Sequence, residues 1–396
     1  MIKSIIIQIA LIILSWLVPK KKSLILLGAG SKHDFRGNPK YLFLFINQNK
    51  TPFDGRWSAG TKSLYYELKN AGLPVVYRYS IKGLWYILRA KYLIIEKSSK
   101  DVYYTDFIFG RFNFLQTWHG ITIKKLGVHA IEEKKGAPGQ SILARPKIWK
   151  FMKKYHLLSM MKYRLILSTT KNQEQLLKDV FLNNRVVTLG YPRNDLFFDK
   201  NLLYKNYQDL LKLRRFQKIF LYAPTFRDSK DSVRPFSESF FQKLNAYFKQ
   251  QNYLFIIKKH PLQANISVPE NLPYIKDYSS KVHDLHDLLF HTDVLISDYS
   301  SAVNDFILTN RPIIYYNYDL EDYERTCRGF YYDYNRIFPG PFAQSEDELL
   351  ATVQNIEKIH KQVGIQSGYR KQKDFFYDHA DGNSSARFLN YIASSL

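Results

Sequence analysis

Short, wholly apolar runs alternate with amphipathic stretches along most of this chain. A short apolar run bounded by Gly, Pro or charged residues is typical of a buried parallel strand, whereas apolar residues three or four apart indicate a helix. Strands are predicted at 23–28, 73–77, 92–95, 114–118, 163–168, 186–190, 218–223, 253–258, 294–297 and 312–316. Helices are predicted near 84–90, 172–180, 347–361 and 383–394.

This alternation predicts an α/β fold in which helices cover parallel strands. It occurs in two series without an internal sequence repeat, so we expect two Rossmann-like domains facing a cleft. A chain of 396 residues is long enough for both. The predicted organisation is a membrane-associating segment at 1–22, an amino-terminal domain at 23–190, a linker at 191–215 and a carboxy-terminal domain at 216–396.

The amino terminus carries an apolar run from Ile5 to Val18, followed by Pro19 and the lysines at 20–22. As a helix, this run reaches about 21 Å, which is less than a hydrocarbon core of about 30 Å. The charge follows the run instead of preceding it, so a cleaved signal peptide is not expected either. We expect an in-plane anchor whose lysines hold the cytoplasmic membrane surface. The alternative is a buried first helix of the fold.

The composition is strongly basic, with 58 Lys and Arg against 35 Asp and Glu and a formal net charge of +23. Polyanions are therefore the expected partners: phosphorylated substrates, anionic lipid or nucleic acid. Residues 134–173 contain no carboxylate, and aromatic and Met residues lie among their basic ones. This segment is either a solvated helical face or a second contact with anionic headgroups, through Lys147, Lys150, Lys153 and Lys154.

Cofactor and metal sites are not expected. Cys327 is the only cysteine, which excludes an intramolecular disulfide and fits a reducing compartment. Gly28-Ala29-Gly30 lacks the third glycine of a dinucleotide fingerprint. His283, His286 and His291 lie close together without a zinc-binding pattern, so we expect them to be solvated. A divalent ion that accompanies the substrate is not excluded.

The strongest candidate for catalysis is His119, in the sequence Trp118-His119-Gly120 directly after an apolar run. In α/β folds such strand ends carry the ligand site. The ordinary pKa of histidine, near 6.5, suits it to removing a proton from a hydroxyl at neutral pH. The alternative is a structural histidine bonded to a backbone carbonyl.

Two further strand ends carry cationic groups. Arg227 follows the strand at 218–223 in the sequence Thr225-Phe226-Arg227, and a guanidinium there can bind phosphate oxygens in a fork. Lys258 precedes His260-Pro261 at the next strand end. We interpret His260 as a second catalytic group and this motif as one that stabilises a pyrophosphate or leaving group. The alternatives are a surface salt bridge of Arg227 with Asp228 and ordinary solvation of the lysines.

A fourth strand end has the sequence Ser297-Asp298-Tyr299-Ser300-Ser301 before an apolar helix that begins near Ala302. The N–H groups and dipole of a helix amino terminus attract phosphate, and Ser300 and Ser301 add hydroxyls. Helix capping alone needs only one of these serines. Asp298 and Asp305 lack the spacing of paired metal ligands. The candidate substrate-binding residues here are Ser297, Asp298, Ser300, Ser301 and Asp305.

Taken in order, these motifs resemble the CDP-glycerol glycerophosphotransferase family of wall teichoic acid synthesis in Gram-positive bacteria. The resemblance covers most of the chain, from about Asn38 to Pro341. The matching residues are 116–120 with 124–127, 190–195, 223–227, 260–261, 296–301, 318–321, 328–333 and 339–341.

The resemblance implies a GT-B-like architecture whose amino-terminal domain faces acceptor and membrane and whose carboxy-terminal domain binds the CDP donor. It implies transfer of glycerol phosphate from CDP-glycerol to a lipid-linked acceptor of the undecaprenyl-diphosphate disaccharide type, with release of CMP. Arg328 is an implied substrate-binding residue. The chain's size resembles the priming enzymes, and Ile121-Thr122-Ile123 departs from the small-Pro-Leu pattern expected after His-Gly.

Two alternatives remain open. A protein of the same fold could use CDP-ribitol or elongate a capsule polymer. A non-catalytic basic protein could instead bind lipid or nucleic acid through its charge, with salt-sensitive affinity and no nucleotide specificity. Because the motifs indicate an enzyme, nucleic acid is not an expected partner.

Overall fold

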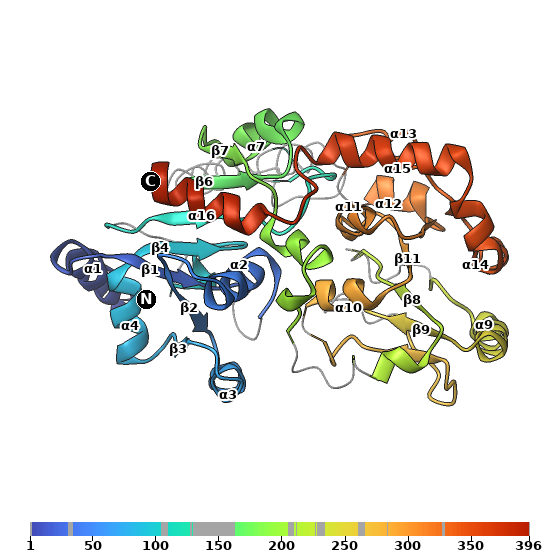
Figure 1. Cartoon of the computed structure of the whole chain (residues 1–396), viewed down its shortest axis with the longest axis horizontal. Coiled ribbons are helices and arrows are strands. Elements are labelled where there is room, and N and C mark those ends of the chain that lie inside the picture. Colours follow the sequence, from blue (N-terminus) through green and yellow to red (C-terminus); the bar gives the residue numbers. More distant parts are fainter. Residues whose placement is uncertain are drawn as a thin grey trace. The chain divides into compact units, whose positions relative to one another are not determined.

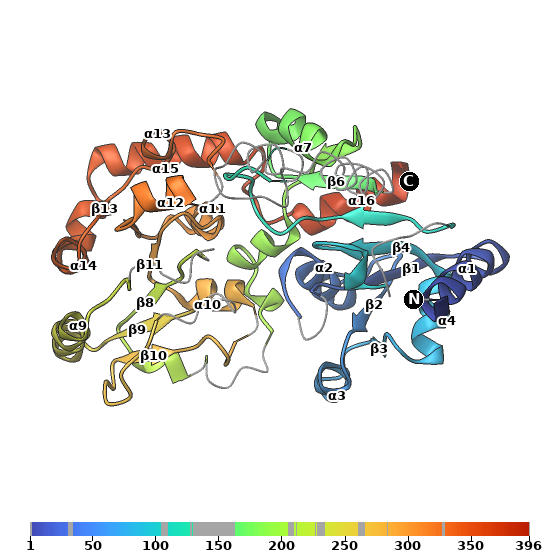
Figure 2. The ribbon, with the colours of Figure 1, turned by 180° about the vertical axis from the view of Figure 1, so that it is seen from behind.

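The computed structural model describes residues 2–30, 35–103, 110–126, 129, 163–204, 210, 212–225, 227, 234–259, 266–282, 284–326 and 329–395. The chain forms two compact units. Unit 1 contains Met1–His119, Leu126–Leu202 and Asp378–Leu396, and unit 2 contains Gly120–Lys125 and Leu203–Tyr377. The colours of Figures 1 and 2 follow the chain through both units.

Unit 1 is built on a parallel sheet which, within the described residues, has seven strands in the order β3-β2-β1-β4-β5-β6-β7. The strand order reverses between β1 and β4, where Ile25 is in register with Tyr92. The strands are β1 (Lys21–Leu27), β2 (Asp54–Ala59), β3 (Val75–Tyr77), β4 (Ala90–Ile95), β5 (Phe114–Gln116), β6 (Tyr163–Ser168) and β7 (Val186–Thr188).

The described α-helices of unit 1 are α1 (Ile2–Leu17), α2 (Gly37–Gln48), α3 (Lys62–Asn70), α4 (Ile81–Arg89), α7 (Glu174–Phe181) and α16 (Ser384–Ser395). Hydroxyl groups cap two of them: Thr61 accepts the N–H of Leu64 at the start of α3, and Ser80 accepts the N–H of Gly83 at the start of α4. Short 3-10 helices are η1 (Ser99–Asp101), η2 (Lys171–Gln173), η3 (Pro192–Phe197) and η4 (Lys200–Leu202).

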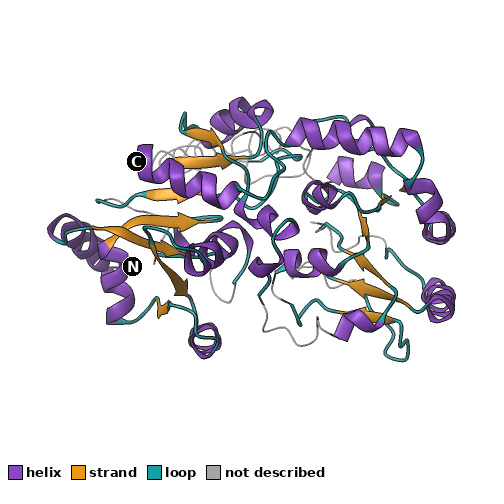
Figure 3. Ribbon diagram, in the orientation of Figure 1, coloured by secondary structure: helices purple, strands orange, loops and turns teal. Residues whose placement is uncertain are grey.

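Strands are orange and helices purple in Figure 3. Unit 2 has a second parallel sheet, with six described strands in the order β10-β9-β8-β11-β12-β13. Its strands are β8 (Lys218–Tyr222), β9 (Tyr253–Ile257), β10 (Ile275–Asp277), β11 (Val294–Ser297), β12 (Ile313–Tyr316) and β13 (Phe342–Ala343). Its helices are α9 (Glu238–Gln251), α10 (Leu285–His291), α11 (Ala302–Phe306), α12 (Leu320–Thr326), α13 (Tyr334–Ile337), α14 (Glu346–His360) and α15 (Val363–Phe376), with 3-10 helices η5 (Lys212–Arg215) and η6 (Ile307–Thr309).

Aromatic residues fill the core of unit 2. Phe236 stacks on Phe240 and Tyr316 at centroid distances of 5.1 and 5.6 Å, and Phe220 packs on Phe248 at 5.0 Å. Such pairs add to the free energy gained from burial alone. Aromatic residues make up 16% of the sequence, and those in this core stabilise it.

The predicted α/β fold with parallel sheets is confirmed. The strands predicted at 163–168 and 294–297 have the observed bounds, and the two predicted carboxy-terminal helices are each displaced by one residue. The predicted linker at 191–215 is wrong at its start, because η3 is buried in unit 1 from Pro192 to Leu196. In this part of the chain, unit 2 begins after Leu202.

The carboxy-terminal helix also differs from the prediction, which placed 216–396 in one domain. Residues from Asp378 onward belong to unit 1. The carboxylate of Asp195 in η3 accepts the N–H groups of Ser384 and Ser385, at 2.9 and 2.7 Å, and so fixes the start of α16. Burial raises the pKa of Asp195, and these serine N–H groups act in the opposite direction.

The segment predicted to be the membrane anchor forms helix α1. It buries Leu11 and Ser15, whereas Ile13, Trp16 and Leu17 are exposed, Trp16 by 64% and Leu17 by 71%. Among the described helices, none has both the length and the apolar character needed to cross a bilayer. The helix thus turns Leu11 and Ser15 inward and leaves other apolar side chains outward, whereas an ordinary surface helix exposes polar side chains.

Candidate active site

The candidate base, His119, lies in the turn that follows β5 at the carboxyl edge of the unit 1 sheet. Thr117 fixes the start of the turn, because its N–H and its hydroxyl both donate to the carbonyl of Ile95, each at 2.8 Å. Trp118 then adopts a left-handed backbone with φ of 57°. Its ring lies 4.1 Å from the His119 ring, which is exposed to solvent.

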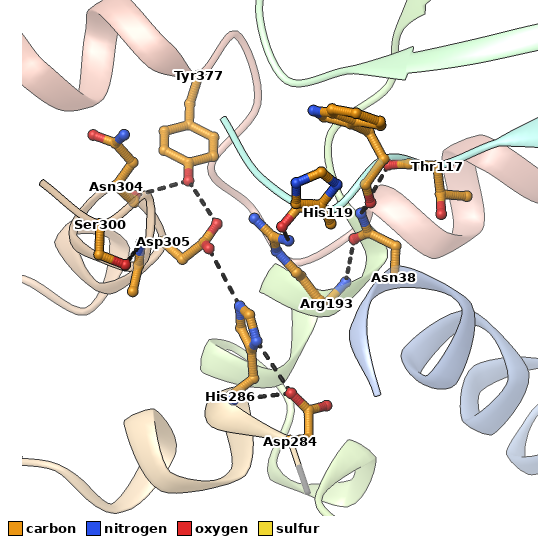
Figure 4. Close-up of polar contacts among 12 residues, drawn as sticks. Asn38, Thr117, His119, Arg193, Asp284, His286, Ser300, Asn304, Asp305 and Tyr377 are labelled. Atoms are coloured by element: carbon orange, nitrogen blue, oxygen red, sulfur yellow. Dashed lines mark hydrogen bonds and ion pairs between the residues drawn. The ribbon is translucent and has the colours of Figure 1, made fainter. Parts of the chain in front are cut away.

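Two buried side chains contact the carbonyl groups of this turn (Figure 4). The amide of Asn38 donates to the carbonyls of Thr117 and Trp118, at 2.9 and 2.8 Å. The guanidinium of Arg193 donates to the carbonyl of His119 at 2.6 Å. His119 is an exposed residue, and its role as a base stays a prediction.

The chain passes from unit 1 into unit 2 between His119 and Gly120. The buried residues Ile121 and Ile123 pack in unit 2, where the carbonyl of Ile123 accepts the N–H of Tyr331 at 2.8 Å. The departure from the family pattern at 121–123 therefore supplies apolar side chains to the interior of unit 2. The ammonium of Lys124 donates to the hydroxyl of Thr225 at 3.4 Å and lies 5.1 Å from the centre of the Tyr323 ring.

In unit 2 the strand order reverses between β8 and β11, and the loops after these two strands carry Arg227 and Asp298. The guanidinium of Arg227 is only 4% exposed and pairs with Asp298 at 2.8 Å and Asp319 at 2.7 Å. It also donates to the carbonyl of Thr225 at 2.6 Å. Burial by itself would lower the pKa of Arg227, but Asp298 and Asp319 outweigh burial and raise it.

Aromatic rings enclose this ion-pair cluster. The Arg227 guanidinium lies 5.2 Å from the Tyr299 ring centre and 5.0 Å from that of Tyr323. The hydroxyl of Tyr299 donates to Asp319 at 3.1 Å. The placement of Arg227 differs from the predicted fork onto phosphate, because it forms hydrogen bonds and ion pairs with described residues of unit 2 itself.

Several other predicted substrate-binding residues also have internal partners. Ser297 is buried and donates to the carbonyl of Ala223 at 2.6 Å. Lys258 donates to the carbonyls of Ser279 and Val282, at 2.8 and 2.6 Å. A direct contact with substrate would require these groups to exchange partners. In the structure, Lys258 links the loops after β9 and β10, and Ser297 links the end of β11 to the loop after β8.

The serine pair is more accessible. Ser300 and Ser301 are half-buried, as is Thr225 in the loop after β8. The Ser300 hydroxyl accepts the N–H of Ala302 at 3.3 Å. The helix does begin at Ala302, as predicted, but α11 has only five residues before η6, so its dipole is weaker than expected.

A buried polar network lies beneath α11 and contradicts the expectation that His286 is solvated (Figure 4). The two ring nitrogens of His286 lie 3.3 Å from Asp284 and 3.3 Å from Asp305. The second carboxylate oxygen of Asp305 accepts from the Tyr377 hydroxyl at 3.3 Å. Asp305, predicted to bind substrate, therefore joins α10 and α15 to α11. His291 is half-buried, and burial, with Arg214 and Arg311, lowers its pKa.

Some predicted site residues lie outside the described residues: His260, Arg328, Lys147, Lys150, Lys153 and Lys154. Their roles stay predictions. Among the residues that the structure does describe, no group of three or more His, Cys, Asp or Glu side chains is arranged to hold a metal ion.

Asn38, Arg193 and Asp319 are not among the site residues predicted from the sequence. All three lie in segments that carry the family resemblance, at 38–41, 190–195 and 318–321. Their position in these matching segments could have marked them as candidate site residues. What they contact could not be inferred, because their partners are 79, 74 and 92 residues away in the sequence.

Curated relatives match almost the whole chain. A teichoic acid poly(glycerol phosphate) polymerase of Bacillus spizizenii is 28% identical over 95% of this chain and 93% of its own. A teichoic acid glycerol-phosphate primase of Bacillus subtilis is 29% identical over 97% and 94%. A teichoic acid poly(ribitol-phosphate) polymerase of Bacillus spizizenii is 28% identical over 95% of this chain and 57% of its own.

A solved structure shares the fold. The wall teichoic acid polymerase TagF, in a soak with CDPG, aligns with a TM-score of 0.72 at 22% identity over 94% of this chain and 89% of that one. The predicted GT-B-like architecture agrees with this match. The family model described as CDP-Glycerol:Poly(glycerophosphate) glycerophosphotransferase matches residues 10–394, and this chain belongs to that family.

Proposed function

We propose that this protein transfers glycerol phosphate from CDP-glycerol to a lipid-linked acceptor of the undecaprenyl-diphosphate disaccharide type and releases CMP. The family match that spans both units carries the proposal. An exposed His119 on a firmly held turn at the carboxyl edge of the unit 1 sheet supports it. So do the names of the glycerol-phosphate relatives and the CDPG soak of TagF.

In the proposed reaction, the neutral imidazole of His119 accepts the proton of the acceptor hydroxyl. The hydroxyl oxygen attacks the β-phosphorus of CDP-glycerol and forms a new P–O bond. The bond from that phosphorus to the oxygen of CMP breaks, and CMP leaves with the electron pair. Phosphoryl transfer of this kind needs positioning and charge stabilisation more than covalent catalysis. His260 is the predicted stabiliser of the leaving group.

The proposed donor site lies in unit 2, at the point where its strand order reverses. Thr225 and the pair Ser300 and Ser301 follow β8 and β11 there and are accessible enough to contact the pyrophosphate. Arg227 and Asp298 support the two loops from below, through their internal ion pair.

Ser300→Ala tests this site. A lost hydroxyl contact is expected to weaken CDP-glycerol binding by about 0.5–1.5 kcal/mol, measured by calorimetry. Ser239→Ala removes an exposed serine from α9 in the same unit and is the matched control. Equal affinities for wild type and the Ser300 variant would remove Ser300 from the donor site.

CDP-ribitol is the second candidate donor, favoured by a ribitol-phosphate polymerase at an identity similar to that of the glycerol relatives. Pure protein with acceptor and either donor should release CMP, and faster from CDP-glycerol. Faster release of CMP from CDP-ribitol would show that the protein transfers ribitol phosphate instead. No acceptor-dependent release from either donor would contradict transfer altogether.

We also propose that the protein is peripheral on the cytoplasmic face of the membrane, with α1 in the plane of the interface. The outward face of α1 is apolar, with Ile13, Trp16 and Leu17 exposed, and Lys21 and Lys22 follow it. Apolar burial combined with attraction to anionic headgroups is how in-plane helices bind. The basic segment with Lys147, Lys150, Lys153 and Lys154 is the proposed second attachment.

The double variant Ile13→Gln with Trp16→Gln is expected to lower binding to anionic vesicles at least about tenfold. In the wild-type protein these two apolar side chains would be transferred from water into the membrane interface, and glutamine gains no such burial energy. Co-sedimentation across a salt series measures this. Val363→Gln, at an 81% exposed apolar residue of unit 2, should bind like wild type. Deletion of residues 1–18 should leave only salt-sensitive binding through the basic segment. Full binding by the double variant would contradict the role of α1.

A further inference from the structure

The turn that carries His119 has a conformation that its own sequence disfavours. Trp118 has φ of 57°, in the left-handed region that residues with a Cβ rarely adopt. Such a residue costs about 1–3 kcal/mol and persists only where its surroundings hold it. On the side-chain side, the Trp118 ring packs edge-on against Phe181 at 4.8 Å.

On the backbone side, Asn38 and Arg193 hold three consecutive carbonyls. Asn38 donates to those of Thr117 and Trp118, and Arg193 donates to that of His119. The two residues are also joined, because the Asn38 side-chain oxygen accepts the backbone N–H of Arg193 at 3.2 Å. Asn38 is fully buried and Arg193 nearly so. We call this arrangement the carbonyl clamp.

We infer that Asn38 and Arg193 are positioning residues, which hold the backbone of Thr117–His119 so that the imidazole of His119 is aimed at the acceptor hydroxyl. This inference rests on the proposed role of His119 as the base. A base acts only within about 0.5 Å of its productive position, and a displacement of about 1 Å can cost about 100-fold in rate. The clamp fixes the main chain of the base while its ring stays exposed.

The clamp is itself anchored in unit 1. Arg193 is the second residue of η3, and two residues later Asp195 ties the same short helix to the start of α16. The Arg193 guanidinium also lies 4.9 Å from the centre of the Tyr191 ring. Residues of both α2 and η3 therefore hold the turn, and its backbone is restricted to one conformation.

Asn38→Asp is the first test. The change keeps the shape and the oxygen that faces Arg193, but sets a carboxylate oxygen against the carbonyls of Thr117 and Trp118. Turnover of CDP-glycerol, as kcat, should fall about 10- to 100-fold, while the KM for CDP-glycerol stays within about twofold. Asn47→Asp, which removes an amide bonded to the Phe43 carbonyl in the same helix, should leave kcat near wild type.

Arg193 supplies a second, independent pair of variants. Arg193→Lys keeps a cationic donor for the His119 carbonyl and should retain several-fold more kcat than Arg193→Met, which has none. The comparison of kcat between these two Arg193 variants does not depend on whether the Asn38→Asp protein folds. Equal kcat for the two, at equal thermal stability, would show that only the bulk of Arg193 matters and would overturn the inference.

A double-mutant cycle separates this inference from the proposed function. If Asn38 acts through His119, Asn38→Asp should cost less than about twofold in kcat when His119 is already alanine. A full additional 10- to 100-fold loss in that background would overturn the inference while leaving His119 as the base. Wild-type turnover by His119→Ala alone would instead overturn the base assignment and, with it, the inference.

Discussion

His119→Ala is expected to slow CMP release at least about 100-fold and to leave the affinity for CDP-glycerol near that of the wild type. General-base catalysis contributes about 100- to 10,000-fold, and an exposed imidazole at the carboxyl edge of the unit 1 sheet is placed for it. The donor is expected to bind to residues of unit 2, which this change does not touch. Steady-state CMP release and calorimetry with CDP-glycerol measure the two effects separately.

His379→Ala is the matched control, because His379 is an exposed histidine of the same unit. Its turnover should equal that of the wild type. If His119→Ala turns over normally, His119 is not the base. If it loses donor affinity together with turnover, His119 belongs to the donor site.

Arg227→Met is expected to lower the free energy of unfolding by about 3–5 kcal/mol. The change leaves the buried carboxylates of Asp298 and Asp319 without their cation, and an uncompensated buried charge is strongly destabilising. Equilibrium denaturation, followed by the fluorescence of the aromatic residues, measures the loss.

Arg336→Met is the contrasting case, because Arg336 forms an ion pair with Asp333 at the surface and its side chain is 87% exposed. An exposed pair contributes about 0–1 kcal/mol, so little change is expected. A stable Arg227→Met protein that has lost only its affinity for CDP-glycerol would contradict the structural assignment. It would restore Arg227 as a direct phosphate ligand.

The sequence predicted strands well where burial makes them mostly apolar, as at 163–168 and 294–297. It missed β2, whose residues Asp54–Ala59 include Asp, Gly and Arg and form a strand only through pairing with β1 and β3. It missed α15 for a related reason, since Gly364 and Gly368 weaken the helical pattern that packing in unit 2 stabilises.

For the site, the sequence located the loops but not the partners of their side chains. His119 lies at a strand end and is exposed, as a base requires. Arg227 was expected to bind phosphate oxygens, with a surface salt bridge to Asp228 as the alternative, yet its partners are Asp298 and Asp319, 71 and 92 residues further along. A local motif shows which residue types meet at a strand end. Which of them face inward depends on contacts that the fold makes between distant segments.

Transfer of glycerol phosphate is tested most directly with CDP-glycerol labelled separately in its cytidine and its glycerol, incubated with pure protein and a lipid-linked disaccharide acceptor. Glycerol label is expected to enter the lipid phase as cytidine label appears in CMP, one for one, and His119→Ala is expected to stop both together. CMP release without any glycerol label in the lipid, or label transfer that does not depend on the acceptor, would contradict this transfer.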